Sequence, residues 1–409
     1  MEFLKVDSIE AAREKLLSSV GGWMARQEVL PPGQAPGRIL AQDIFAREDI
    51  PAFRRSTVDG YAVLSKDTAA ASDSIPVFLA VKGQVEMGLP ALFAIENGEC
   101  AEVPTGAMLP GGADAVVMIE YAEKFGTDGV AVYSGVSHGE NVVQIGEDAK
   151  SGELLLHRGK QILPQDIGVF AAAGVSGVPV FAPLRVTIIS TGDEIIPPGQ
   201  APQPGQVRDI NTGALSALAQ KNGFEVVGTA VLPDDETALE QALRAAMQTS
   251  DVAIASGGSS QGKKDMTKTL IDRVAAPGVY THGLAVKPGK PTILGVDSAS
   301  QTLLVGLPGH PVSAMIVFEL LLGWLLREIT GSQGPPAIPA RMSCNVACAP
   351  GKTTCWPVKL HWTGDGYEAQ PVFGKSGLIT TLAKADGYIT VGRDTEGLNA
   401  GQTVLVQMF

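Results

Sequence analysis

The segment from about residue 185 to residue 330 alternates continuous apolar runs with stretches of helical periodicity. The runs are RVTIIS, FEVVGTAVL, DVAIAS, TILGV and TLLVG, and helix-like stretches such as TGALSALAQKNG and DETALEQALRAAMQ separate them. Apolar runs of this kind are typical of strands that helices bury on both faces. The pattern therefore predicts an α/β unit with a mostly parallel sheet, closed by the long helix after Pro311.

The flanking regions predict β structure instead. Short apolar runs between glycines and prolines precede the α/β unit, and alternating runs return after the linker-like segment GSQGPPAIPA. A chain of 409 residues is also too long for one core. We expect a multidomain α/β plus β protein with four parts: an N-terminal helix with an elongated hinge domain (1–42 and 149–180), a β-rich inserted domain (43–148), a central α/β domain (181–330) and a C-terminal β-barrel-like domain (335–409).

Composition narrows the class of protein. An apolar content of 45% and a charged content of 18% are those of a folded globular chain. The net charge of −12 argues against nucleic acid or an anionic membrane as a partner of the whole chain. The longest apolar stretch contains Glu319 and Arg327, which favours a packed helix over a membrane span. The N-terminal residues predict an amphipathic helix from Asp7 and not a signal peptide, so we expect a cytoplasmic protein.

Three of the four cysteines, Cys344, Cys348 and Cys355, cluster near the C-terminus with His361, so a zinc site has to be considered. Their spacings fit no closed four-ligand pattern. The other interpretation is that they are small buried residues on alternating strands. The sequence leaves their role open.

Three of the apolar runs end in loops of small residues: STGDE at 190–194, SGGSSQG at 256–262 and GLPGHP at 306–311. In open α/β sheets, ligands bind beyond the carboxyl ends of parallel strands. Glycine lets the backbone approach a ligand closely, and free N–H groups at helix starts favour an anion. Each loop alone could be a simple turn, but three of them on one edge predict a ligand site.

Acidic side chains follow the same strands. Asp193, Glu194 and Asp265 lie at or just after these strand ends, and Asp234 ends another run in VLPDD. Carboxylates beside a phosphate repel it unless a cation bridges them, so Mg²⁺ is the ion that we expect here. The alternative is that Asp234 and Glu194 are helix N-caps or solvated loop residues.

Two lysines, Lys287 and Lys290, flank a Pro-Gly turn in VKPGKP and are candidates to hold a phosphate or another oxyanion. Lys263 and Lys264 could do the same, although a solvated surface explains them equally well. The histidines form no ligand-spaced pair, and no Gly-x-Ser-x-Gly elbow is present. Metal-assisted chemistry on a phosphorylated ligand is therefore the hypothesis that the residues favour.

Eight motifs, in order along the chain, resemble those of the molybdopterin molybdenumtransferases, the MoeA-type enzymes related to the C-terminal domain of gephyrin. They are DIPAFRRSTVDGYAV (49–63), VPTGAMLPGGADAVVMIE (103–120), GEDAKSG (146–152), STGDEI, SGGSSQGKKD, VKPGKP, GLPGHPVSA and LAKADGYI (382–389). The resemblance runs nearly end to end and implies that the α/β domain binds molybdopterin.

The resemblance also implies an activity, which is the insertion of molybdate, or of tungstate, into adenylylated molybdopterin in a Mg²⁺-dependent reaction that releases AMP. Members of the family are homodimers in which the first motif of one protomer completes the pocket of its partner. The adenylyltransferase that supplies the substrate is a further expected partner. A gephyrin-like scaffold without turnover and a molybdopterin adenylyltransferase remain as alternatives.

Together, the loops and the matched motifs give the candidate site. The catalytic set is Asp59, Asp148, Glu194 and Asp265, and the metal set is Glu194, Asp234 and Asp265. The substrate-binding set is Thr105, Ser190, Thr191, Gly192, Asp234, Ser256, Gly257, Gly258, Ser259, Gly262, Lys287, Lys290, Gly306, Pro308, Gly309 and Pro311. The sequence departs from the family pattern at three positions: Val58 replaces a methionine, Gly283 replaces a lysine of some members, and His310 replaces the common asparagine.

Overall fold

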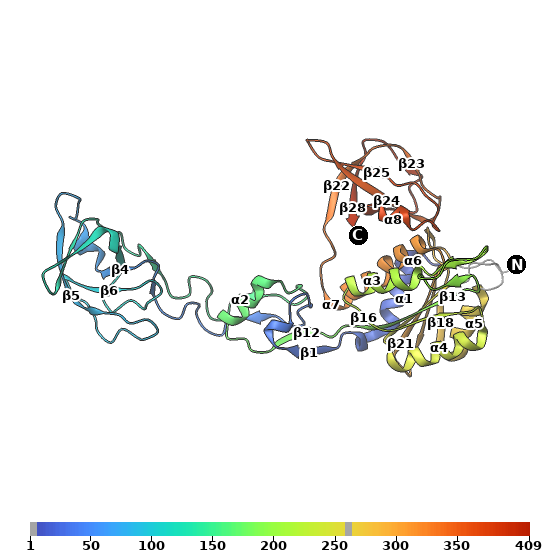
Figure 1. Cartoon of the computed structure of the whole chain (residues 1–409), viewed down its shortest axis with the longest axis horizontal. Coiled ribbons are helices and arrows are strands. Elements are labelled where there is room, and N and C mark those ends of the chain that lie inside the picture. The colour runs from blue at the N-terminus through green and yellow to red at the C-terminus, as the bar shows by residue number, and fades with distance from the viewer. Residues whose placement is uncertain (1–5, 258–263) are drawn as a thin grey trace.

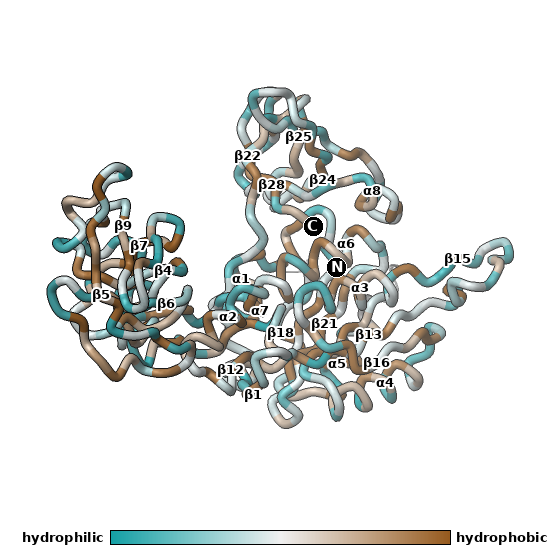
Figure 2. Tube along the Cα trace, turned by 60° about the vertical axis from the view of Figure 1, so that its left-hand side comes forward, coloured by the Kyte–Doolittle hydropathy of each residue, from teal (hydrophilic) through white to brown (hydrophobic). Residues whose placement is uncertain are grey.

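The computed structural model describes residues 6–257 and 264–409, without the side chains of Lys264 and Asp265. The chain is elongated (Figure 1): a β-rich unit lies at one end, a small hinge unit follows, and the α/β unit lies at the other end. The C-terminal unit lies beside the α/β unit in this view and in the view turned by 60° (Figure 2). Three residues of the candidate site, Gly258, Ser259 and Gly262, lie outside the described residues, and so does the side chain of Asp265.

The α/β unit is built on a six-stranded sheet with the order β16-β13-β17-β21-β20-β18. The strands are β13 (Arg185–Thr191), β16 (Glu225–Leu232), β17 (Val252–Gly257), β18 (Pro277–His282), β20 (Ile293–Asp297) and β21 (Thr302–Leu307). The first four strands in this order pair in parallel, whereas β20 and β18 pair antiparallel. The mostly parallel sheet expected from the sequence is confirmed.

Helices cover both faces of this sheet (Figure 1). They are α1 (Ile9–Val20), α3 (Asn211–Lys221), α6 (Pro311–Phe318) and α7 (Trp324–Thr330) on one face, and α4 (Glu236–Thr249) and α5 (Lys264–Val274) on the other. Successive side chains of β13 enter opposite cores, Ile188 on one face and Ile189 on the other. This double burial is why the strands read as continuous apolar runs. Of the helices that the structure describes, none is long and apolar enough to cross a membrane.

The β-rich unit is an insertion between two halves of the hinge. Its sheet has the order β7-β4-β6-β5-β9-β8, with β4 (Gly60–Val63), β5 (Val77–Gln84), β6 (Glu99–Val103), β7 (Ala115–Met118), β8 (Ala122–Phe125) and β9 (Gly129–Val132). The hinge pairs β1 (Gln27–Leu30) with β12 (Val178–Phe181) and β2 (Ile44–Phe45) with β11 (Leu154–Leu156), and it contains α2 (Pro164–Ala172). Each pair joins a strand before the insertion to one after it.

The C-terminal unit is a closed barrel, as the sequence led us to expect. Its strands pair in the order β24 (Thr353–Trp362), β25 (Tyr367–Pro371), β22 (Ala337–Met342), β28 (Thr403–Met408) and β26 (Gly387–Val391), and β26 pairs back with β24. A short strand of the α/β unit, β19 (Val286–Lys287), pairs in parallel with β24. The barrel is therefore hydrogen-bonded to the α/β unit as well as linked to it along the chain.

The cysteines of this region are packing residues. Cys344 and Cys348 belong to the barrel core, and Cys355 packs into the core of the α/β unit. All three are free thiols, and burial raises the pKa of Cys355 to about 12. Within the described part of the chain, no three His, Cys, Asp or Glu side chains are grouped so that they could hold a metal ion.

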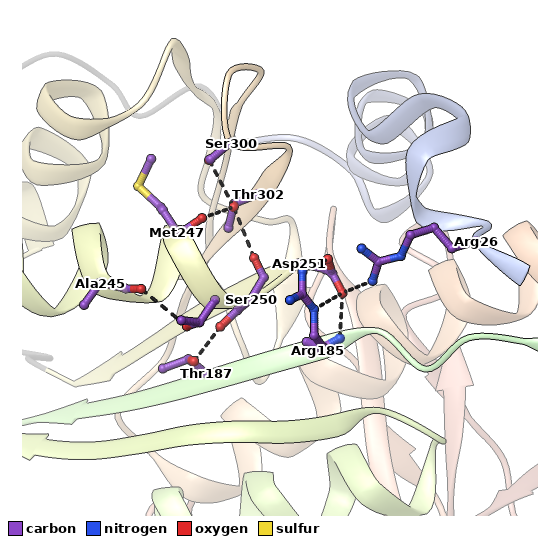
Figure 3. A network of polar contacts seen from close by, with 10 residues as sticks. Arg26, Arg185, Thr187, Ala245, Met247, Ser250, Asp251, Ser300 and Thr302 are labelled. Atoms are coloured by element: carbon purple, nitrogen blue, oxygen red, sulfur yellow. Dashed lines mark hydrogen bonds and ion pairs between the residues drawn. The ribbon is translucent and has the colours of Figure 1, made fainter. Parts of the chain in front are cut away.

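A buried carboxylate fastens the hinge to the α/β unit (Figure 3). Asp251, which is 3% exposed, precedes β17 at the amino-terminal ends of the strands. It accepts hydrogen bonds from Arg26 (2.6 Å) just before β1, and from the side chain and the backbone N–H of Arg185 (3.0 and 2.8 Å) at the start of β13. Burial raises the pKa of Asp251, but these hydrogen bonds outweigh it and the net pKa is lowered.

We expect Asp251→Asn to lower the free energy of unfolding by about 2–3 kcal/mol at neutral pH, because it leaves two arginines without their anion. A carboxyl whose folded pKa is lowered stabilises the fold above its ordinary pKa near 4, and the contribution fades as the pH falls through the folded pKa. The difference in the free energy of unfolding between the native protein and the variant, measured by urea unfolding, should therefore become smaller in acid. The exposed Asp394→Asn is the control, and an equal loss in that variant would contradict the assignment.

Candidate functional site

The carboxyl ends of β13, β17 and β21 lie next to one another. In the strand registers, Thr191 pairs with Gly257 and Ser256 pairs with Leu307. The three small-residue loops therefore start from one edge of the sheet, as the sequence predicts. This is the edge at which open α/β sheets bind ligands.

Small residues let these loops pack closely. A Cβ atom on Gly257 would lie 2.1 Å from Thr191 Oγ1 and 2.4 Å from the Thr191 carbonyl oxygen. A Cβ atom on Gly309 would lie 3.5 Å from the carbonyl carbon of Gly257, so the loop after β21 rests on the end of β17. The sequence requirement for glycine at 257 is steric.

Gly257→Ala should lower the free energy of unfolding by about 3 kcal/mol, because the new methyl group collides with backbone atoms that cannot move aside. Gly213→Ala in α3 is the matched control, since its Cβ would meet nothing within 4 Å. That control should stabilise the protein by about 0.5–1 kcal/mol through helix propensity. Chemical denaturation measures both changes, and equal stabilities of the two variants would contradict the steric argument.

The amino terminus of α3 completes this edge, which the sequence reasoning missed. Asn211 Nδ2 donates to Ser256 Oγ (2.8 Å) and to the Gly309 carbonyl (2.9 Å), and Thr212 Oγ1 lies 2.8 Å from Ser190 Oγ. The available signal was the segment DINT (209–212), whose last two residues begin the helix. The N–H of Thr212 donates to Asp209 Oδ1 at 3.2 Å, and the helix dipole favours further negative charge at this point.

Carboxylates flank the same edge on the loops after β13 and β16. The backbone N–H of Asp234 donates to Asp193 Oδ1 at 3.0 Å, and Glu194 is exposed beside them. The residue that caps α4 is Asp235, whose side chain accepts from Ala238 N at 2.7 Å. The interpretation of Asp234 as the N-cap is therefore wrong.

These groups suit Mg²⁺, which prefers hard oxygen ligands and keeps part of its water shell. The hydrogen bond from the Asp234 N–H to Asp193 Oδ1 joins the loops that follow the adjacent strands β16 and β13. The residues that would hold the ion are Glu194, Asp234 and Asp265, of which Asp265 follows β17 at the start of α5. Carboxylate oxygens suit the ion in chemistry, although the described side chains alone form no group of three such ligands.

A pocket of about 870 Å³ opens between this edge and the barrel. Six residues of the candidate site line it: Gly257, Lys287, Lys290, Gly306, Pro308 and Gly309. The other described candidates from the α/β unit do not line the pocket and lie at or next to the same strand ends: Ser190, Thr191, Gly192, Glu194, Asp234, Ser256 and Pro311. The site thus has a pocket and an adjoining polar edge.

The charged lining of the pocket has one sign. Among the described residues, no carboxylate lines it. The lysines and histidines of the lining are Lys287, Lys290, Lys352, Lys375, His282 and His310. Lys352 and Lys375 belong to the barrel, and sequence reasoning missed them because no local pattern assigns them to this site. Four lysines around one cavity favour the binding of a compact anion.

Local structure fixes the position of Lys287. Its strand β19 pairs with β24, where Lys287 is the partner of Thr354. The following turn needs glycine, because Gly289 has a φ of +124° and a Cβ atom there would lie 2.4 Å from Val317 Cγ2 in α6. The lysine is therefore carried on a rigid segment between the sheet edge and the barrel.

The remaining candidates lie far from this pocket in the same chain. Asp59, just before β4, accepts hydrogen bonds from Thr105 N (2.7 Å) and Thr105 Oγ1 (2.9 Å), and these bonds lower its pKa. Asp148 lies where the chain returns to the hinge, and its N–H donates to the Ile50 carbonyl at 3.0 Å. The β-rich unit that carries Asp59 and Thr105 is at the opposite end of the molecule from the α/β unit (Figure 1).

Three family models match the chain in succession. They are described as "MoeA N-terminal region (domain I and II)" over residues 7–174, "Probable molybdopterin binding domain" over 187–328 and "MoeA C-terminal region (domain IV)" over 339–409. A molybdopterin molybdenumtransferase of Haemophilus influenzae is 32% identical over 98% of each chain. The chain belongs to the molybdopterin molybdenumtransferase (MoeA) family.

Other members of the MoeA family agree with this assignment. A molybdopterin molybdenumtransferase of Bacillus subtilis is 31% identical over 95% of this chain and 89% of its own length. The crystal structure of a MoeA protein of molybdopterin biosynthesis from Pyrococcus horikoshii is similar over 99% of both chains, with a TM-score of 0.83 and 36% identity. In this MoeA chain, the basic pocket lies between the segments that match the molybdopterin-binding and C-terminal models.

Proposed function

We propose that this chain is a molybdopterin molybdenumtransferase that inserts molybdate, or tungstate, into adenylylated molybdopterin with release of AMP. The observation that carries the proposal is the pairing of two environments at one sheet edge. The pocket presents four lysines and no described carboxylate, and the adjoining edge presents small residues, a helix amino terminus and acidic side chains. The first suits an oxyanion, and the second suits a phosphate with a bridging cation.

Each group then has a separate task. The lysines attract molybdate, a small dianion, and hold it by direct contact. The backbone N–H groups at the start of α3 and at the glycines of the strand ends donate hydrogen bonds to the phosphates. Glu194, Asp234 and Asp265 would hold Mg²⁺, and the ion would supply positive charge beside the phosphates. Asp59, kept ionised by its hydrogen bonds from Thr105, is an acceptor for polar groups of the substrate or for metal-bound water.

Two copies of the chain are part of this proposal. One protomer's Asp59, Thr105 and Asp148 would complete the pocket of the other, since its own α/β unit lies at the far end of the molecule. Closed two-fold symmetry would then give two equivalent sites in each dimer. The adenylyltransferase that makes the substrate is the partner that we propose for its delivery.

The test is to incubate the purified protein with adenylylated molybdopterin, Mg²⁺ and either molybdate or tungstate, and to measure AMP. Release of AMP that depends on the oxyanion is the expected result, and the ratio of the two rates gives the metal preference. No release with either oxyanion would overturn the enzymatic proposal and favour the scaffold. Consumption of ATP with unmodified molybdopterin would instead indicate an adenylyltransferase.

A further inference from the structure

One hydrogen bond between two side chains that line the pocket joins the α/β unit to the barrel. His310 immediately precedes α6, and its Nδ1 lies 2.8 Å from Ser376 Oγ in the loop between β25 and α8 (Thr380–Ala383). Beside this contact, the backbone N–H of Val312 donates to the Ser376 carbonyl at 3.2 Å. A barrel loop therefore rests on the first turn of α6.

This loop forms part of the pocket wall. Gly374, Lys375 and Ser376 all line the cavity, and so does His310. The barrel is also tied to the α/β unit by the β19–β24 pairing at Lys287 and by the packing of Cys355, Leu382 and Tyr388 into the α/β core. The position of Lys375 relative to the other lysines thus depends on what holds its loop.

Histidine at position 310 has a polar atom, Nδ1, where the asparagine of the family pattern would have its amide group. An asparagine amide places a polar atom at the same distance from Cα as histidine Nδ1, whereas glutamine places one where Nε2 lies. An asparagine at a helix start usually accepts from backbone N–H groups of the first turn. Here the Val312 N–H is already bonded to Ser376, and the side chain of His310 makes no capping hydrogen bond.

We propose that His310 is a positioning residue that latches the loop containing Lys375 and Ser376 onto α6 and so holds one basic wall of the pocket in place. The latch is a contact of the folded chain, and only its effect on molybdate use rests on the proposed function. Loss of this contact should make the loop more mobile and move Lys375 away from the other lysines. Oxyanion binding should then weaken although all four lysines are still present.

Two measurements on the full-length protein test this proposal. In His310→Ala, hydrogen exchange of the segment 372–381 should become about five- to tenfold faster, because one hydrogen bond is lost. The KM for molybdate should rise about five- to tenfold while kcat stays within about twofold, as expected when binding and not chemistry is affected. His310→Asn should keep both native values, and His310→Gln should behave like alanine. The control is His361→Ala, which removes a barrel histidine bonded to Gln370 at 3.0 Å.

Each outcome bears on the latch separately from the enzymatic proposal. Unchanged exchange in His310→Ala, or equal effects of alanine and asparagine, would overturn it. Faster exchange with an unchanged KM would mean that the loop is held by His310 but does not position the lysines, which also overturns the proposal. If the native protein releases no AMP, the proposed function fails, and hydrogen exchange still decides whether the latch exists.

Discussion

Replacing Lys287 with alanine should lower the rate of molybdate-dependent AMP release by about a hundredfold or more, since a fixed cation is lost from a site that must hold a dianion. Lys287 is the lysine whose backbone is held on both sides, by the β19–β24 pairing and by the turn at Gly289. Its Cα position is thus fixed, so less conformational freedom is lost when its side chain holds the oxyanion. Steady-state rates of AMP release at saturating adenylylated molybdopterin measure the change.

Two further variants make this prediction specific. Lys287→Arg should keep a substantial part of the activity, because it preserves the positive charge. Some activity should be lost, because a guanidinium group differs in shape from an ammonium group. Lys384→Ala removes an exposed lysine of the C-terminal unit that does not line the pocket, and it should leave the rate unchanged. Native activity of Lys287→Ala would exclude the pocket as the oxyanion site, and a comparable loss in Lys384→Ala would point to a general charge effect.

Much of the α/β unit was predictable because its signals are local. Continuous apolar runs indicate doubly covered strands, and the glycine loops after 190, 256 and 306 mark the ends that meet at one edge. Parallel pairing places all of these ends on the same side, so a ligand edge follows from the strand pattern alone. The glycine at 257 is an example in which the steric need and the sequence signal coincide.

The other half of the pocket was not predictable from such patterns. Lys352 and Lys375 lie on the barrel, and single exposed lysines carry no periodicity or spacing that assigns them to a site. Their role depends on how two units pack, which is a long-range property. The bond between His310 and Ser376 spans 66 positions of the chain for the same reason. Asn211 and Thr212 are an intermediate case, because the polar start of a helix is visible in sequence but the edge that it faces is not.

The position of Asp59 leads to the second large prediction, which concerns two copies of the chain. Asp59→Ala and Lys287→Ala should each be nearly inactive as pure dimers. In the first, both sites lack the acceptor from the β-rich unit, and in the second, both lack the fixed cation. If each site combines the sheet edge of one protomer with the Asp59 segment of its partner, a mixed dimer has one intact site and one site with both defects.

Random association of equal amounts of the two variants should then restore about a quarter of the native AMP release, since half of the dimers are mixed and each of these has one active site of two. A site built within one protomer predicts no recovery, because every chain in the mixture is defective. Mixing Asp59→Ala with Thr105→Ala is the matched control: both defects lie in the same half-site, where Thr105 donates to Asp59, so no site becomes intact. Recovery in the first mixture but not in the second would establish that each active site contains residues of both protomers. No recovery in either mixture would indicate that each site is built within one protomer.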